Sequence, residues 1–171
     1  MTSGEHTLPI GVKDLYGTLL DTRTLEINLF WQRSNYFLVL NTGIAFGFFN
    51  LENREFAVIL SVMGLLSSIL WFRVCLGGKF WQTRWEQRLL EFEREHLPGL
   101  DFFAASPERI QADVDKGFAF HSQGWSKRLF YRLALTRPSV SYSMIQLSAL
   151  FVIGWVYFIA VSIWPAWRPI G

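Results

Sequence analysis

The sequence has few of the residues that build catalytic and metal centres. It contains one cysteine, Cys75, among 171 residues, which excludes an internal disulfide and leaves the redox compartment open. Its three histidines, His6, His96 and His121, lie far apart, without a carboxylate or cysteine at ligand spacing. We therefore expect no metal site. The net charge is only +2, which is too small to predict direct nucleic-acid binding.

Catalytic motifs are also missing. Nucleophile-elbow, P-loop and dinucleotide-binding patterns do not occur in the sequence. Glu91, Glu93 and Glu95 form an acidic cluster, but alternate positions of a helix point in different directions, so we interpret the cluster as a solvated face. The spacing of Arg94 and His96 does not fit a helical ribonuclease. The sequence therefore predicts a protein that is not an enzyme and binds no cofactor.

Long apolar stretches are what the sequence does have, with 51% hydrophobic and 17% aromatic residues. The stretch 56–77 is interrupted by a single charge, Arg73, and is long enough to cross the ~30 Å hydrocarbon core of a bilayer as a helix. Residues 142–164 form a second long apolar stretch, and it carries no charge. A shorter one, about 34–49, ends a proline-free segment, 11–49, that predicts one long helix. We expect an all-α polytopic membrane protein with three transmembrane helices and a small helical cytosolic domain.

The distribution of basic residues predicts the orientation of these elements. Lysine and arginine are concentrated before the first expected span and between the second and third, which places the N-terminus and residues 79–141 in the cytosol and the C-terminus outside. The N-terminal residues lack a basic region followed by an apolar one, so we expect no cleavable signal peptide and a bacterial inner-membrane location. The expected order is an N-terminal cytosolic amphipathic helix (1–33), a transmembrane hairpin (34–77, with spans about 34–49 and 56–77), a cytosolic helical region (78–141), a third transmembrane helix (142–164) and a short outer tail (165–171).

The cytosolic region is expected to contain three helical segments. An amphipathic helix follows Gly77-Gly78, a possible bend, and ends at Pro98-Gly99. A short helix begins at Ser106-Pro107-Glu108. Residues 125–137 are basic and amphipathic, so they either lie on an anionic leaflet or pack on other cytosolic helices. The residues that we assign to membrane-surface or partner binding are Lys127, Arg128, Arg132 and Arg137.

Polar residues near the first expected span are informative, because a polar side chain is costly in lipid unless it meets a partner or water. Several of them share one stripe at seven-residue spacing, and a Gly-x-x-x-Gly pair follows. Repeated amides suit a symmetric interface between subunits or a wet pore, whereas packing of the hairpin within one chain is the alternative. The residues that we assign to an oligomer interface or pore lining are Asn28, Asn35, Asn41, Thr42, Gly43 and Gly47.

Two segments carry a resemblance to known proteins. SNYFLVLNT at 34–42 and LGGKFWQTRWEQRLLEFEREHLP at 76–98 resemble the RipA family of octameric bacterial inner-membrane proteins. The layout of a hairpin followed by a cytosolic helix is similar to that of SLATT-type effectors associated with bacterial nucleotide-signalling defence. The matching positions are Asn35, Phe37, Leu38, Leu40, Asn41 and Thr42 in the first segment and Lys79, Phe80, Leu90, Glu91, Leu97 and Pro98 in the second.

Together, these observations predict a homo-oligomer, from a tetramer to an octamer, whose partners are the lipid bilayer, its own copies and a cytosolic protein. The function we expect is that of a membrane component or effector of a bacterial antiphage or stress-response system. It would sense through its cytosolic helices and perturb the membrane. The alternatives are a scaffold that recruits a soluble effector enzyme and a small constitutive channel.

Overall fold

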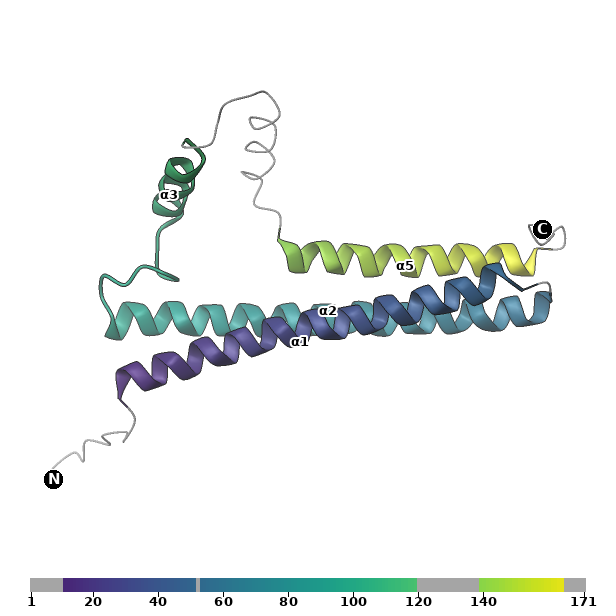
Figure 1. Ribbon diagram of the computed structural model, residues 1–171, viewed down its shortest axis with the longest axis horizontal. Helices are drawn as coiled ribbons and strands as arrows, with labels where there is room; N and C mark the ends of the chain where they lie inside the picture. The colour runs from purple at the N-terminus through teal and green to yellow at the C-terminus, as the bar shows by residue number, and fades with distance from the viewer. Residues whose placement is uncertain (1–10, 52, 120–138, 165–171) are drawn as a thin grey trace. The chain divides into compact units, whose positions relative to one another are not determined.

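The structure is a computed structural model, and it describes residues 11–51, 53–119 and 139–164. Within these ranges all the regular secondary structure is helical, which confirms the all-α class. The helices are α1 (Val12–Phe49), α2 (Arg54–His96), α3 (Pro107–Ala119) and α5 (Val140–Ile163) (Figure 1). The basic segment at 125–137 and the tail at 165–171 lie outside the described residues.

Local sequence explains where the helices begin and end. α1 is one helix, as its lack of proline predicts, and it ends before the polar turn that leads to α2. Asn53 caps α2, because its Oδ1 accepts a hydrogen bond from the Glu55 backbone N–H at 2.9 Å. After His96, the chain turns at Gly99, whose φ of 101° is in the left-handed region that favours glycine. The Ser106 Oγ accepts from the Arg109 backbone N–H at 3.3 Å, which confirms the predicted N-cap of α3.

The bend considered at Gly77-Gly78 does not form, and α2 continues as one helix of 43 residues. A Cβ at Gly78 would lie 2.6 Å from Cδ2 of Phe30 on α1. The absence of a side chain at Gly78 therefore admits the Phe30 ring and allows the two helices to pack closely, while the helical hydrogen bonds continue.

The chain divides into two compact units. One contains Met1–Glu26 and Gln82–Arg137, and we call it the charged unit. The other contains Ile27–Trp81 and Pro138–Gly171, and we call it the apolar unit. α1 and α2 each contribute residues to both units, with no loop between the two parts of either helix.

In the apolar unit, α1 and α2 are antiparallel and α5 runs in the same direction as α1 (Figure 1). Two clusters of buried residues hold the three helices together. The first contains Phe30, Trp71, Cys75 and Ile145. The second contains Phe48, Ala57 and Trp155. Each cluster includes residues from all three helices, so all three contribute to the core of this unit.

Two of the described helices are long and apolar enough to cross a membrane: the α2 residues Glu55–His96 and α5, Val140–Ile163. The expectation of three transmembrane helices is therefore wrong, because the stretch at about 34–49 does not meet the same criterion. Its amides, Asn35 and Asn41, and the polar residues just before it lower its hydropathy below that of a lipid-compatible span.

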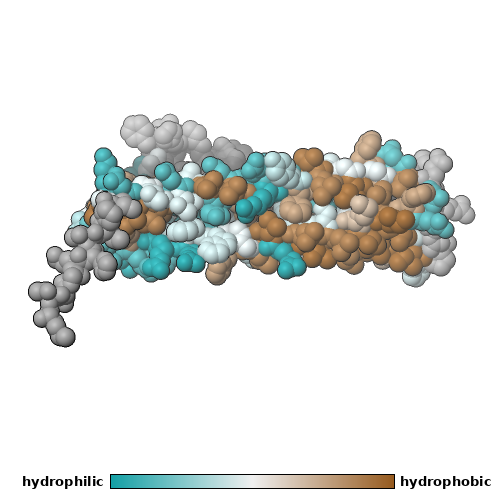
Figure 2. Space-filling model, turned by 90° about the horizontal axis from the view of Figure 1, so that it is seen from below, coloured by the Kyte–Doolittle hydropathy of each residue, from teal (hydrophilic) through white to brown (hydrophobic). Residues whose placement is uncertain are grey.

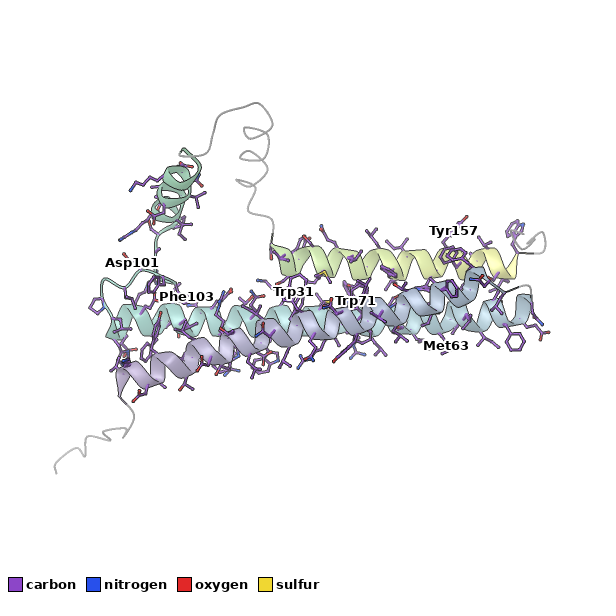
Figure 3. All side chains as sticks on the ribbon, viewed as in Figure 1. Trp31, Met63, Trp71, Asp101, Phe103 and Tyr157 are labelled. Atoms are coloured by element: carbon purple, nitrogen blue, oxygen red, sulfur yellow. The ribbon has the colours of Figure 1, made fainter. Side chains whose placement is uncertain are left out.

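The surfaces of α2 and α5 in the apolar unit are rich in large exposed side chains. Leu66 is 57% exposed and Ile153 is 64% exposed. Met63 and Tyr157 point away from the helices that they belong to, toward the outside (Figure 3). Apolar residues also dominate the face of this unit seen in Figure 2. Such surfaces are stable only against lipid or another protein.

In the charged unit, the first part of α1 packs against the last part of α2. Leu89 and Phe92 of α2 are buried, as expected for the apolar face of an amphipathic helix. The Phe92 ring stacks between Tyr16, at a centroid distance of 5.9 Å, and His96, at 4.6 Å. Aromatic stacking therefore joins the two helices in this unit.

Candidate functional site

Asn41 is the centre of a buried polar cluster in the apolar unit. The residue is fully buried. Its Nδ2 donates to the Phe37 carbonyl at 2.9 Å and to Ser67 Oγ at 3.2 Å. Its Oδ1 accepts from Ser68 Oγ at 2.8 Å and from Trp155 Nε1 at 3.0 Å. All four hydrogen-bonding positions of the amide are used, so Asn41 joins α1, α2 and α5 within one chain.

Gly64 makes this arrangement possible. A Cβ at this position would lie 2.2 Å from Cε2 of Trp155, so only glycine lets the indole lie against α2. Phe48 packs edge-on against the same indole, with the ring centroids 6.0 Å apart. The indole is held on both sides, and its N–H is thereby directed at the Asn41 oxygen. We call Asn41, Ser67, Ser68 and Trp155 the polar lock.

The other polar residues predicted on α1 have a different environment. Asn28, Asn35 and Thr42 are exposed on the outer side of α1. The Thr42 Oγ1 donates to the Leu38 carbonyl of its own helix at 2.8 Å. The side chains of Asn28 and Asn35 make no hydrogen bond within the described ranges. The structure therefore separates Asn41, which faces the interior, from the stripe beside it, which faces outward.

The two glycines of the Gly-x-x-x-Gly pair are also on different surfaces. A Cβ at Gly47 would lie 3.1 Å from Cδ1 of Leu60, so Gly47 packs against α2. A Cβ at Gly43 would have nothing within 4 Å, and Gly43 is exposed. Only Gly43 is therefore available to a neighbouring molecule.

Glu93 contradicts the interpretation of the acidic cluster as a solvated face. Its residue exposure is 1%. Its Oε1 accepts from the Tyr16 hydroxyl at 2.7 Å, and its Oε2 accepts from the backbone N–H groups of Phe103 at 2.8 Å and Ala104 at 2.9 Å. Glu91 and Glu95 are exposed, as predicted. One carboxylate of α2 therefore holds both the segment after α2 and Tyr16 of α1.

The phenol of Tyr16 is affected by this contact. Burial of the hydroxyl, together with the hydrogen bond to Glu93 and the negative charge of that carboxylate, raises the pKa of Tyr16 from 10.0 to about 12. Tyr16 therefore keeps its proton, and its hydrogen bond to Glu93, further into the alkaline range than an exposed tyrosine does.

A cavity of about 350 Å³ lies beside this cluster, entirely within the charged unit. The Arg23 Nη2 on its wall is 3.1 Å from Glu86 Oε1, and the Arg23 guanidinium carbon lies 5.1 Å from the centroid of the Phe103 ring (Figure 3 labels Phe103). The Nε of Arg23 is buried and has no hydrogen-bond partner among the described residues. The cavity is lined by Arg23, Thr83, Glu86, Gln87, Leu90, Phe102 and Phe103.

Comparison with known proteins identifies the family to which the chain belongs. The sequence matches the octameric membrane protein family (8xMP) over residues 13–164. The chain belongs to this family. No curated protein and no solved structure gives a significant match. The match includes α1, α2, α3 and α5, and it confirms the resemblance to octameric membrane proteins that the segments at 34–42 and 76–98 suggested.

Family membership makes the chain a membrane protein that forms a homo-oligomer, as the family description states. This conclusion fits the exposed apolar surfaces of α2 and α5. Of the residues predicted to bind a membrane surface or a partner, Lys127, Arg128, Arg132 and Arg137 all lie outside the described residues. Within the described ranges, no group of three or more histidine, cysteine, aspartate or glutamate side chains is arranged to hold a metal ion.

Sequence reasoning missed two important residues. A signal for Glu93 was present, because it follows the buried Leu89 by four positions and therefore shares its helical face. For Trp155, the sequence contained no comparable signal. Its partner Asn41 is 114 positions away, and only the packing of α5 on the hairpin brings the two together.

Proposed function

We propose that the protein is a non-enzymatic, homo-oligomeric membrane effector of a bacterial antiphage or stress-response system. In this proposal, the charged unit senses a change in the cell and the apolar unit perturbs the inner membrane. The main support is that α1 and α2 each belong to both units without an intervening loop. A change in the charged unit therefore acts on helices that also form the core of the apolar unit.

The charged unit has features that suit a sensing role. The cavity beside Arg23 is within the size range of small-ligand sites. One wall of it is the segment that Glu93 holds through the Phe103 and Ala104 amides. Because this segment is fastened by one carboxylate, a molecule that displaces Phe103 or competes for Arg23 would alter the packing of α1 against α2.

The apolar unit has the surface that a membrane-perturbing protein needs. Large apolar side chains are exposed along α2 and α5, and the polar lock joins the three helices by hydrogen bonds within one chain. A stable apolar unit can change its contacts with neighbouring copies or with lipid while its own fold is preserved.

A second candidate function is a scaffold that recruits a soluble partner. The observation that favours it is Phe102, which is 72% exposed beside the cavity and is adjacent to the segment held by Glu93. A fixed, exposed aromatic side chain is a common anchor for a protein partner.

Membrane potential distinguishes these functions. A voltage-sensitive dye in bacteria that express the protein should report loss of potential during phage infection or envelope stress and not before. The variant R23Q should reach the membrane in equal amounts but fail to respond, because it lacks the charge that pairs with Glu86. The variant R88Q is the matched control, since Arg88 is 62% exposed and, among the described residues, forms its ion pair with Glu91 of its own helix turn.

The other outcomes are equally clear. Intact potential during infection, with wild-type protein present in the membrane, would reject the effector function. If a soluble protein then co-purified with wild type and was lost from the variant F102A, the scaffold would be supported. Loss of potential in unstressed cells would instead indicate a constitutive channel.

A further inference from the structure

The position of α1 in the apolar unit raises a question of solvation. α1 packs along both membrane-compatible helices: Phe30 shares a core cluster with Trp71 and Ile145, and Phe48 shares one with Trp155. By its own composition, however, α1 does not qualify as a lipid-facing span. Such a helix is too polar to face lipid, although it packs against two helices that can. Its outer side therefore needs a contact with protein or water.

The outer side of α1 carries several of the polar residues that lower the hydropathy of this helix. Exposed positions follow one another at alternating spacings of four and three, which is the pattern of a helix–helix contact surface. We call these residues the α1 outer row: Asn28, Gln32, Asn35, Val39, Thr42 and Phe46. Four of the six have polar side chains, and three of these, Asn28, Asn35 and Thr42, are seven residues apart.

The corresponding exposed rows of the other two helices are different. On α2 the exposed positions in the apolar stretch include Ile59, Met63, Leu66 and Leu70, and on α5 they include Leu150, Ile153 and Tyr157. These side chains are compatible with lipid. The α5 row begins with a single exposed amide, Gln146, near the start of that helix, whereas the α1 outer row contains three, so the need for a polar contact is greatest on α1.

The position of Asn35 beside the apolar stretch of α2 makes its amide costly unless it is hydrogen-bonded. Asn35 follows Ser34, whose Oγ lies 3.8 Å from the Sγ of Cys75 within the apolar stretch of α2. Arg73, exposed on α2 close to this level, has a side chain long enough to extend to the lipid headgroups. An asparagine side chain is too short to do so. Asn35 therefore needs a hydrogen-bond partner beside it.

Gly43 gives this surface a shape that suits another helix. It is exposed next to Thr42, and no atom lies within 4 Å of the position that a Cβ would occupy. Val39 and Phe46, each 72% exposed, flank it. A small residue between two projecting side chains lets a neighbouring backbone approach closely, as in membrane helix pairs.

We propose that the α1 outer row is the surface through which one copy of the chain binds the next, leaving α2 and α5 to face lipid. The occupant is a second copy because the chain belongs to a family of homo-oligomeric membrane proteins. A row of amides can supply donors and acceptors to an identical chain. This inference depends on family membership and packing, and it holds whether or not the protein is an effector.

A pair of glycine variants tests the surface without disturbing the fold. G43L adds bulk where the single chain has open space, so it should preserve the helical content but convert the detergent-solubilised oligomer to smaller particles. G77L is the matched control, because Gly77 is also exposed with nothing within 4 Å, but it lies on α2. Unchanged particle size for G43L, or dissociation by G77L alone, would overturn the proposal.

Photo-crosslinking identifies the neighbour directly. A benzophenone amino acid at Val39 should give crosslinks to a second copy, whereas the same group at Leu66, which is 57% exposed on α2, should react with lipid. Crosslinks between copies from position 66 and none from 39 would contradict the assignment. If position 39 gave none and N35C in the assembled protein reacted with a charged, water-soluble thiol reagent, the row would line an aqueous lumen, and the proposal would also fail.

Discussion

The indole Nε1 of Trp155 lies 3.0 Å from the Oδ1 of Asn41, to which it donates a hydrogen bond between α5 and α1. Ser68 of α2 donates to the same oxygen at 2.8 Å. The amide oxygen is therefore the point at which the three helices of the apolar unit meet. In an apolar environment an unpaired amide or indole N–H is costly, so this contact favours one arrangement of the helices over all others.

Replacing Asn41 should weaken the apolar unit. In N41L the Trp155 N–H loses its acceptor in a buried position, while the serine hydroxyls can turn to their own helix backbone. We expect a loss of about 1–3 kcal/mol of unfolding free energy, measured by titrating the purified protein from mild detergent into SDS. The control Q146L changes an exposed amide of α5 in the same way and should have little effect. Equal losses in both variants would show that Asn41 has no special role.

Gly64 should be intolerant of any side chain. In G64A the new methyl group would meet the Trp155 indole, whose Cε2 lies 2.2 Å from the position of that Cβ. Displacement of the indole should cost about 1–3 kcal/mol, even though alanine favours helix formation. G77A places the same methyl group in open space and should be neutral or stabilise by up to about 1 kcal/mol. Trp155 fluorescence reports the displacement when the other tryptophans are replaced by phenylalanine.

Glu93 should control the order of the segment that follows α2. In E93Q the side chain loses its negative charge and one of its two acceptor oxygens, so the hydrogen bonds from the backbone N–H groups of Phe103 and Ala104 are either lost or made to a neutral acceptor, which binds them more weakly. Hydrogen exchange at the amides of Phe103 and Ala104 should become at least about tenfold faster, which corresponds to about 1.4 kcal/mol. E91Q, at an exposed position, is the control. Unchanged exchange in E93Q would mean that the segment is held by its apolar contacts alone.

Alkaline pH should destabilise the charged unit through Tyr16. The folded state holds the phenol proton up to a pKa of about 12, whereas an unfolded tyrosine releases it near 10.0. Its stabilising contribution is therefore complete below pH 10 and is lost progressively as the pH rises from 10 toward 12. The variant Y16F should remove this part of the pH dependence. A tyrosinate absorbance titration in which wild type and Y16F differ by a group titrating at the ordinary value would refute the expectation.

Periodicity was enough to predict much of the fold. The absence of proline between residues 11 and 49 predicted α1, and Pro98-Gly99 and Ser106-Pro107 marked the end of α2 and the start of α3. The seven-residue spacing placed Asn28, Asn35 and Thr42 on one side of α1, where the structure also has them. These features depend on neighbours within one or two helical turns, which is why the sequence reveals them.

The asparagines of α1 show what periodicity alone does not predict. Asn35 and Asn41 were both assigned to an oligomer interface or pore lining, yet one is exposed and the other is fully buried. Glu93 shares a helical face with Leu89, but the sequence does not show the partners that it meets from α1 and from the segment after α2. Composition also overestimated the number of spans, because the outer side of α1 carries amides among its exposed apolar residues.

The sequence by itself determined that the chain is helical, that it is a membrane protein and where most of its helices begin and end, because apolar runs, caps and breakers act locally. Only the tertiary structure decided which polar groups are buried and paired. Trp155 reaches Asn41 because Gly64 leaves room for an indole, and that fit depends on three helices that are distant in sequence and adjacent in space.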